Sequence, residues 1–357
     1  MAYTVSTSSA GETLVGTSGN DAVVNVTTTK NVQVNAYEGD DAVTLTAAAT
    51  SGSVGMGAGK DTVRATGGAS TLKFSLGDAA DSFTSTAANT SITVGGQGGA
   101  DTFAVVAGGR FNSYNGGQGK DTFTGNLGLQ DTIQGGSEDD TVGAAGAGVQ
   151  VGQLSFINGQ VGKDTIFVNT AATDATVRGG SEDDTITVTG GVNAIILYGD
   201  KGADKLTGGA GADELFGGGG ADTLDGADGA DELTGGAGKD NFVIGGVLTA
   251  NSAAIQDFTV SDDKIQITAA NYAAYTAGTA VTVTNIAGFA AGAVIIDTAA
   301  NIAAANIGAS AGSIAIESDT GNILYDADGD WTAAVQTVGT VSQSVVSSLT
   351  ASSFVAA

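Results

Sequence analysis

An aspartate repeated at regular intervals constrains the fold of this chain more than any other feature. Two residues after each of these aspartates stands a large apolar side chain, and two residues before it stands, in most units, a glycine. The interval is 20 residues along much of the chain and shortens to nine in the last units. A register kept over so many units predicts a repeat architecture, in which each unit packs mainly on its neighbours. The aspartates are Asp21, Asp41, Asp61, Asp81, Asp101, Asp121, Asp140, Asp164, Asp184, Asp204, Asp213, Asp222, Asp231 and Asp240.

Each unit is interpreted as a turn followed by a short strand. Glycines adopt the positive-φ backbone that tight turns require, and segments such as 164–168 alternate apolar and polar residues as a half-buried strand does. A second turn, such as 66–70, and a second strand, such as 71–76, follow about half a unit later. The pattern predicts an all-β fold: a right-handed parallel β-roll or β-helix solenoid of about 20-residue and then 18-residue coils. Neighbouring coils are expected to stack about 4.8 Å apart.

The repeat divides the chain into four segments. We expect an N-terminal cap or joining strand in residues 1–15, a solenoid of about 20-residue coils in 16–198, and a roll of nine-residue units in 199–243. Residues 244–357 contain more Ala and Ile and fewer Asp–Gly turns, which predicts a β-rich C-terminal domain. A chain of 357 residues is long enough to bury a sizeable core.

Residues 199–243 consist of five uninterrupted nine-residue units: GDKGADKLT, GGAGADELF, GGGGADTLD, GADGADELT and GGAGKDNFV. This block resembles the RTX calcium-binding repeat, Gly-Gly-x-Gly-x-Asp-x-apolar-x, and residues 116–124 match the same pattern. Five in-frame copies leave little room for chance. The resemblance implies that the turns bind several Ca²⁺ ions.

The spacing suits calcium coordination. Ca²⁺ takes about 6–8 oxygen ligands, and one glycine turn with one carboxylate supplies only half of them, so a second stacked turn completes the shell. Successive 20-residue coils place their turns on one side, whereas nine-residue turns alternate sides, so Asp204 pairs with Asp222 and Asp213 with Asp231. The resemblance implies carboxylate ligands at Asp41, Asp61, Asp81, Asp101, Asp121, Asp140, Asp164, Asp184, Asp204, Asp213, Asp222, Asp231 and Asp240. It implies further ligands at turn residues Gly199, Gly202, Gly208, Gly209, Ala210, Gly211, Gly217, Gly218, Gly220, Gly226, Gly229, Gly235, Gly236 and Gly238.

An aspartate in a glycine-rich turn can also be a turn former alone, and that alternative stays open for the irregular turns. Ala79, Glu138 and Glu182 replace the turn glycine, and Asp21 stands in the first coil, where a stacking partner below is missing. The net charge of the chain favours metal binding by these aspartates. With 12 basic and 38 acidic residues the net charge is −26, and stacked carboxylates repel each other unless cations lie between them.

Composition excludes several functional classes. A net charge of −26 opposes binding to nucleic acid, whose phosphates demand a basic face. The chain has no His and no Cys, so it offers no imidazole base, thiolate nucleophile, disulfide or Cys-type zinc site. No run reaches the length of about 18 apolar residues that a membrane span needs. The N-terminus lacks the basic and apolar segments of a cleavable secretory signal.

The C-terminal region resembles that of type I secretion substrates that carry RTX repeats. The resemblance implies an uncleaved C-terminal export signal that is read by an ABC-type exporter, and therefore a secreted protein of the extracellular cell surface. The segments that carry it are 255–267, 321–330 and 348–357.

Two short motifs are rejected as sites. The run 326–330 alternates aspartates as an EF-hand loop does, but its glycine is misplaced and Thr337 stands where the twelfth-position Glu belongs, so we expect a hairpin turn. Residues 308–312 match the G-x-S-x-G nucleophile elbow, but the chain has no His to act as base. The only arginines lie in unrelated units: Arg64, Arg110 and Arg178.

These observations predict a non-enzymatic protein. The leading hypothesis is a secreted, calcium-dependent structural protein that assembles with copies of itself, as a surface-layer subunit or an extracellular filament. The organisation resembles RTX-type surface-layer proteins of Gram-negative bacteria. The alternative is a calcium-dependent adhesin that binds glycan or another surface, with cell-surface polysaccharide as partner. A β-helix enzyme acting on polysaccharide is the alternative that the sequence favours least.

Overall fold

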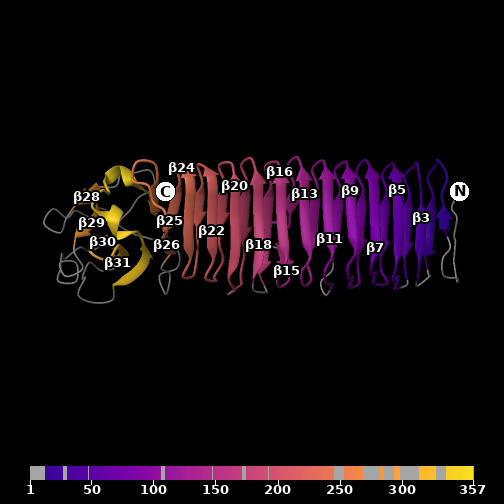
Figure 1. Ribbon diagram of the computed structural model, residues 1–357, viewed down its shortest axis with the longest axis horizontal. Helices are drawn as coiled ribbons and strands as arrows, with labels where there is room; N and C mark the ends of the chain where they lie inside the picture. The colour runs from indigo at the N-terminus through magenta and orange to yellow at the C-terminus, as the bar shows by residue number, and fades with distance from the viewer. Residues whose placement is uncertain are drawn as a thin grey trace. The chain divides into compact units, whose positions relative to one another are not determined.

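The computed structural model divides the chain into two compact units, Met1–Gly191 and Val192–Ala357, and each is described here by itself. Figure 1 shows both as series of short strands joined by turns. The described residues are 13–26, 30–46, 48–105, 109–146, 148–170, 174–191, 193–244, 253–267, 282–284, 293–297, 313–326 and 335–356. Almost all of their regular structure is β-strand, as the sequence predicts.

The first unit is a stack of coils, and each coil contributes one strand to each of two parallel sheets. Sheet A takes the strands that precede the aspartate turns: β1 (Thr13–Val15), β3 (Val32–Asn35), β5 (Gly52–Ala58), β7 (Leu72–Asp78), β9 (Thr93–Gly98), β11 (Ser113–Gln118), β13 (Thr132–Ser137), β16 (Phe156–Val161) and β18 (Ala175–Ser181). Sheet B takes the strands that follow those turns: β2 (Ala22–Val26), β4 (Ala42–Leu45), β6 (Thr62–Ala65), β8 (Ser82–Ser85), β10 (Thr102–Val105), β12 (Thr122–Gly125), β14 (Thr141–Val142), β15 (Val149–Val151), β17 (Thr165–Thr170) and β19 (Thr185–Val188).

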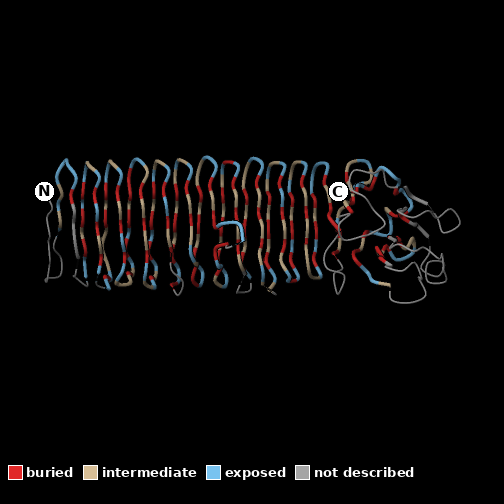
Figure 2. Tube along the Cα trace, turned by 180° about the vertical axis from the view of Figure 1, so that it is seen from behind, coloured by how far each residue is buried: buried red, intermediate tan, exposed pale blue. Residues whose placement is uncertain are grey.

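Neighbouring coils pair in register, one repeat apart. Val43 of β4 lies beside Val63 of β6, and Phe103 of β10 lies beside Phe123 of β12, so equivalent positions form columns. The apolar residue two positions after the aspartate lies in the inward column of sheet B, and Val63, Phe83 and Phe103 are fully buried. Figure 2 shows the resulting alternation of buried and less buried residues along the strands.

Aromatic rings fill part of this narrow core between the sheets. The Phe103 and Phe123 rings stack with centroids 4.6 Å apart, and Phe74 of sheet A meets Phe83 of sheet B edge to face at 5.2 Å. Such packing secures one register, because a slip by one residue would turn every apolar side chain outward.

The second unit begins with shorter coils, as the nine-residue spacing predicts. Its sheet A strands are β20 (Ile195–Lys201), β22 (Glu214–Gly220), β24 (Glu232–Gly238) and β26 (Ala253–Ile255). Its sheet B strands are β21 (Lys205–Thr207), β23 (Thr223–Asp225), β25 (Asn241–Ile244), β27 (Lys264–Ile267) and β33 (Phe354–Ala356). Leu206 pairs with Leu224 and Leu224 with Phe242, which places equivalent residues 18 positions apart.

The C-terminal part of the second unit is also β-rich. It contains β28 (Thr282–Thr284), β29 (Ala293–Asp297), β30 (Ser313–Glu317), β31 (Asn322–Asp326) and β32 (Gln336–Thr340), with the short helices α2 (Gln343–Val346) and η3 (Ala351–Ser353). Strands β31 and β32 pair antiparallel, which agrees with the expected hairpin, although its turn lies outside the described residues. The rejected motif at 308–312 and residues 1–12 of the expected cap also lie outside them.

Candidate metal centre

Each motif aspartate lies at the end of a turn that contains residues with positive φ, a backbone conformation that glycine adopts most easily. In the turn before Asp101, Gln97 and Gly99 have φ values of 79° and 116°, in the region that favours glycine. Gly217–Asp222 of the second unit repeats this geometry, with φ of 106° at Gly218 and 145° at Gly220. The glycines of the repeat therefore shape the turn, and the shape directs the aspartate side chain inward, where Asp101 is only 1% exposed.

One carboxylate oxygen of each aspartate holds two coils together. Asp101 Oδ1 accepts the N–H of Asp81 at 2.8 Å, and Asp121 Oδ1 accepts the N–H of Asp101 at 2.7 Å. In the second unit Asp222 Oδ1 accepts the N–H of Asp204 at 2.8 Å, and Asp231 Oδ1 accepts that of Asp213 at 2.9 Å. The aspartates thus stack as the sequence predicts, including the two-unit step between nine-residue turns.

The second oxygen of most of these carboxylates is buried with no hydrogen-bond partner. Burying an ionised oxygen without a partner is costly, and native proteins rarely leave such groups unpaired. A whole row of them indicates a ligand that is not part of the chain. The aspartates whose Oδ2 atoms are in this state are Asp41, Asp61, Asp81, Asp101, Asp121, Asp140, Asp164, Asp222, Asp231 and Asp240.

Beside several of these oxygens the space is open only because a glycine lies there. A methyl carbon added to Gly217 would lie 2.5 Å from Asp222 Oδ2 and 2.6 Å from the carbonyl oxygen of Gly235, one coil further on. Gly199 and Gly208 border corresponding spaces, facing the carbonyls of Gly217 and Gly226. Two oxygens that converge without a donor between them repel each other, and a cation relieves that repulsion.

Burial also raises the pKa of these carboxyl groups. It raises the pKa of Asp101, Asp121, Asp222 and Asp231 to about 7, with neighbouring acidic groups adding to the effect. The pKa of Asp140 rises to about 8 for the same reason. A bare negative charge is therefore unfavourable in these turns, and a divalent cation would stabilise it.

Three aspartates differ, because a backbone N–H group pairs the second carboxylate oxygen, Oδ2, of each. Oδ2 of Asp21 accepts the N–H of Thr17 at 2.6 Å, and Oδ2 of Asp213 accepts the N–H of Gly209 at 2.7 Å. Asp263 behaves alike: its Oδ1 accepts the N–H of Asp240 and its Oδ2 that of Thr259. The sequence interpretation missed Asp263, although its spacing to an apolar residue two positions on is that of the other units.

The opposite edge of the first unit carries a second buried polar ladder that the sequence interpretation also missed. Asn89 Oδ1 accepts the N–H of Ala69, Asn112 Oδ1 that of Ile92, and Asp131 Oδ1 that of Asn112. The remaining polar atoms of these side chains find partners within the chain, since Asn112 Nδ2 donates to the Asn89 carbonyl and Asp131 Oδ2 accepts from Gly128. This edge is satisfied without a ligand.

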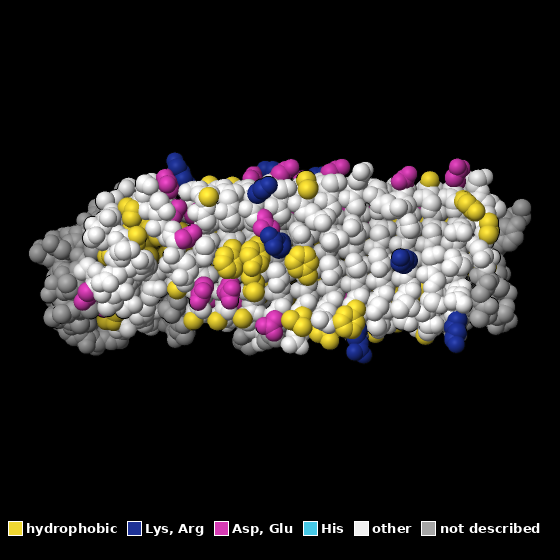
Figure 3. All heavy atoms as spheres, viewed as in Figure 1, with side chains coloured by type: hydrophobic (Ala, Val, Ile, Leu, Met, Phe, Trp, Pro, Cys, Tyr) yellow, Lys and Arg dark blue, Asp and Glu magenta, His cyan; other side chains and the backbone are white. Residues whose placement is uncertain are grey.

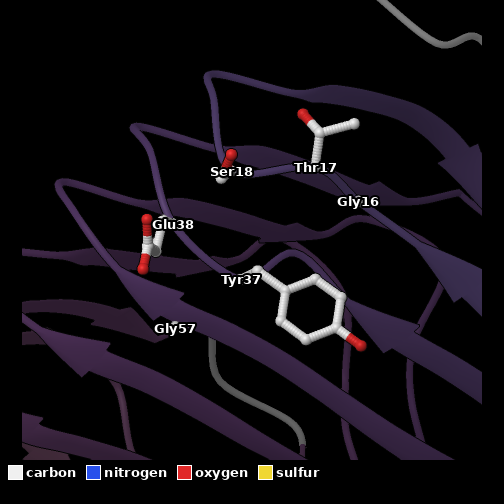
Figure 4. A pocket seen from close by; sticks show the side chains of 6 residues that line it. All are labelled: Gly16, Thr17, Ser18, Tyr37, Glu38 and Gly57. Carbon is white, nitrogen blue, oxygen red and sulfur yellow. The ribbon is translucent and has the colours of Figure 1, made fainter.

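A pocket lies beside the first turns of the first unit, among Gly16, Thr17, Ser18, Tyr37, Glu38 and Gly57 (Figure 4). It offers two hydroxyl groups, one carboxylate and an exposed tyrosine ring. Thr17, which lines the pocket, also donates its N–H to the buried Asp21 carboxylate, so the pocket lies beside the first aspartate of the ladder.

The fold and the turns define a parallel β-solenoid protein with stacked Asp–Gly turns suited to cations. The sequence-family model of the RTX calcium-binding nonapeptide repeat (4 copies) matches residues 196–224 and 216–246. This part of the chain therefore consists of RTX repeats, which are calcium-binding motifs, and its turns bind several Ca²⁺ ions. No curated protein gives a significant match to the chain. The described residues contain no helix long and apolar enough to cross a membrane.

The residues present fit calcium. Within the described ranges no three acidic side chains gather to hold a metal by themselves, so main-chain carbonyls must supply the other hard oxygen ligands that calcium prefers. Asp222 Oδ2 with the Gly235 carbonyl is the clearest such pair. Calcium bound there supplies positive charge between coils. The other predicted turn residues, Gly202, Gly209, Ala210, Gly211, Gly218, Gly220, Gly229, Gly236 and Gly238, lie within the same turns, and their part in coordination stays a prediction.

Proposed function

We propose that the chain is a secreted, calcium-dependent structural protein that assembles with copies of itself on the cell surface, as a surface layer or an extracellular filament. The observation that carries the proposal is the buried row of carboxylate oxygens without partners. Because calcium would pair these oxygens, the stack of repeated coils depends on calcium for its rigidity. A rigid repeat stack suits a building element, and the proposal assigns it no catalytic activity.

The distribution of charge supports assembly in calcium. Sixteen of the 38 acidic residues are aspartates buried inside the coils, so calcium would neutralise charge within the protein. The face seen in Figure 3 is dominated by uncharged polar side chains and backbone, with charged groups scattered over it. Neutralising the interior lowers the repulsion between copies, since net charge far from zero keeps proteins apart.

The beginning of the first unit also favours contacts between copies. Val15 of β1 is 63% exposed and Tyr37, close to it in the next coil, is 53% exposed. Exposed apolar side chains in the first described coils are suited to meeting another copy.

Negative-stain electron microscopy tests the proposal. The purified chain is dialysed into millimolar calcium and, in parallel, into EDTA. We expect ordered sheets or fibres in calcium alone. Dispersed particles in calcium, at concentrations where the chain is folded, would contradict self-assembly. The variant Val15→Asp places a charge at the exposed start of the stack and should weaken assembly without changing the calcium content.

A calcium-dependent adhesin is the second candidate, and one surface feature favours it. Tyr198 and Phe216 lie on the outer face of sheet A in the second unit, with rings stacked at 4.9 Å between centroids. Both rings are half-buried, and aromatic rings with part of their surface open are common contact points for other surfaces. Binding to purified cell-surface polysaccharide by a chain that stays monomeric in calcium, lost in Tyr198→Ala, would favour this function.

Export by an ABC-type exporter is part of the proposal. It rests on the resemblance of segments 255–267, 321–330 and 348–357 to type I secretion substrates. Expression with and without the exporter tests it. The chain should reach the medium or the cell surface only when the exporter is present, and equal amounts outside both strains would contradict the proposal.

A further inference from the structure

The motif turns adopt two backbone conformations, which differ at the fourth and the second residue before the aspartate. In the turn of Asp222 these residues are Gly218 and Gly220, whose φ values are 106° and 145°. In the turn of Asp213 the glycines at the same two places have no positive φ. Both turns have the sequence Gly-Gly-x-Gly-Ala-Asp, so their composition does not account for the difference.

The conformation with two positive φ values, which we call the open turn, occurs wherever the aspartate has an unpartnered Oδ2. Side chains other than glycine adopt it as well. Four residues before Asp41 and Asp101, Tyr37 and Gln97 have φ values of 76° and 79°, a region that such residues seldom occupy. Strain of this kind persists only where the surrounding structure enforces it, and an ion bound to the turn is such a constraint.

In the other conformation, the closed turn, the chain itself pairs the second carboxylate oxygen. The donor is the N–H of the fourth residue before the aspartate, and the three pairs are Thr17 with Asp21 at 2.6 Å, Gly209 with Asp213 at 2.7 Å, and Thr259 with Asp263 at 2.7 Å. None of these donors has a positive φ, and neither do the residues two positions before the three aspartates. The N–H supplies the positive partner that Oδ2 otherwise lacks.

The turn of Asp240 shows where the same N–H lies when the turn is open. Gly236, four residues before Asp240, donates its N–H to Asp257 Oδ2 at 2.8 Å, and Gly235 donates to Asp257 Oδ1 at 2.9 Å. Asp240 Oδ2 is left buried without a partner. One change of the backbone therefore takes the N–H away from the carboxylate and leaves that oxygen for a cation.

The closed turns stand where a series of stacked aspartates begins or ends. Asp21 is the first motif aspartate of the chain. Asp213 has Ile195 before it in the stack, because the Ile195 N–H donates to Asp213 Oδ1 at 3.0 Å. After Asp263 the register of β27 with β33 places Ser352 at the corresponding position. A turn at such an end has a motif aspartate on one side only, whereas calcium needs oxygen ligands from two stacked turns.

We infer that the turns of Asp21, Asp213 and Asp263 bind no calcium, because a backbone N–H takes the place of the ion, and that calcium binds only in open turns. This inference rests on the calcium binding assigned above and does not depend on self-assembly. It removes Asp213 from the aspartates that the repeat spacing predicts as calcium ligands. The closed turns thus end each series of calcium sites without leaving a carboxylate oxygen unpaired.

A pair of substitutions in the second unit tests the inference in the full chain. Asp213→Asn and Asp222→Asn make the same isosteric change in a closed and an open turn of nearly identical sequence. After equilibrium dialysis against calcium chloride, Asp222→Asn should bind at least one ion fewer per chain than the wild type, and Asp213→Asn the same number. Far-UV circular dichroism in saturating calcium checks that both variants are folded. Equal losses in the two folded variants would overturn the inference.

A second pair in the first unit keeps the test decisive if Asp213→Asn does not fold. Asp21→Asn should keep the calcium content of the wild type, whereas Asp41→Asn should bind at least one ion fewer per chain. Loss of an ion in a folded Asp21→Asn, or unchanged calcium in Asp41→Asn, would overturn the inference. Wild-type chain without bound calcium would instead refute the calcium assignment itself.

Discussion

A comparison of the surroundings of two glycines shows that the atom opposite a carbonyl oxygen decides whether a turn needs a cation. Beside Gly217 the open space is shared by two oxygens, Asp222 Oδ2 and the carbonyl of Gly235. Beside Gly109, on the opposite edge of the first unit, a methyl carbon would lie 2.5 Å from the carbonyl oxygen of Asn89 and 2.6 Å from Asn112 Nδ2. That nitrogen donates to that carbonyl, so the amide supplies the positive partner that calcium supplies elsewhere.

The amide ladder leads to a prediction about stability. Asn112→Ala removes the acceptor for the Ile92 N–H, which is left unpaired, and one of two donors to the Asn89 carbonyl, which keeps the N–H of Arg110. We expect a loss of about 1–3 kcal/mol in the free energy of unfolding at saturating calcium. Asn115→Ala, which removes a half-buried bond to Gln134, should cost less than about 1 kcal/mol. Thermal unfolding checks both, and a loss of bound calcium in Asn112→Ala would contradict the assignment of this edge as metal-free.

Removal of a buried hydroxyl group should raise the free energy of unfolding, the opposite of the effect expected for Asn112→Ala. Tyr114 has no exposed surface, and its hydroxyl oxygen has no hydrogen-bond partner. Tyr114→Phe removes that unsatisfied group while keeping the ring, so we expect stability to rise by about 1 kcal/mol. Tyr37→Phe, at an exposed tyrosine, serves as the control and should have no effect. A lower melting temperature for Tyr114→Phe in saturating calcium would show that the hydroxyl contributes a favourable interaction.

At the scale of the turn and its strands, the metal-free aspartate ladder should respond to pH. Burial raises the pKa of Asp101 and Asp121 to about 7, and that of Asp140 to about 8, from the ordinary value of 3.8. The folded state therefore binds more protons than the unfolded state between these values, so the free energy of unfolding falls as the pH rises through this window. We expect calcium-free chain to keep more of its far-UV circular dichroism signal for β-sheet at pH 5 than at pH 8.

Saturating calcium is the control for this pH dependence. The ion takes the place of the proton beside each carboxylate, and it binds the deprotonated form. The loss of sheet signal from pH 5 to pH 8 should therefore be removed or reversed in calcium. A calcium-free chain that is more stable at pH 8 would show that burial does not control these groups.

Much of the fold could be predicted from the sequence, because the aspartate spacing and the apolar residue two positions later report directly on coil length and on the inward face. Val63 and Phe103 lie in the core for this reason. The hydrogen-bond state of each carboxylate could not be predicted. Asp213 and Asp222 have the same spacing in the sequence, but only the fold shows that Gly209 donates its N–H to Asp213 Oδ2 while Asp222 Oδ2 has no partner. The Asn89–Asn112 ladder escaped detection because its spacing is irregular.

For the whole molecule, the dependence of folding on calcium is the broadest prediction. Coils whose carboxylates need an ion cannot stack stably without it, so the free energy of calcium binding contributes to the free energy of folding. We expect chelation to unfold most of the chain and to reduce the far-UV circular dichroism signal of the sheets strongly. A sheet signal unchanged in EDTA would contradict this dependence.

Hydrogen exchange resolves the same transition along the chain. In a repeat stack each coil depends mainly on its neighbours, so one part can open while another remains folded. Amides of residues 253–267, where backbone N–H groups pair both oxygens of Asp263, should lose protection in EDTA last. Amides of 113–142 and 214–244, whose turns contain buried carboxylate oxygens without partners, should exchange as soon as calcium is removed. The reverse order would mean that unpaired carboxylates do not make a turn depend on the ion, and that interactions between coils, rather than the turns, set the stability of each region.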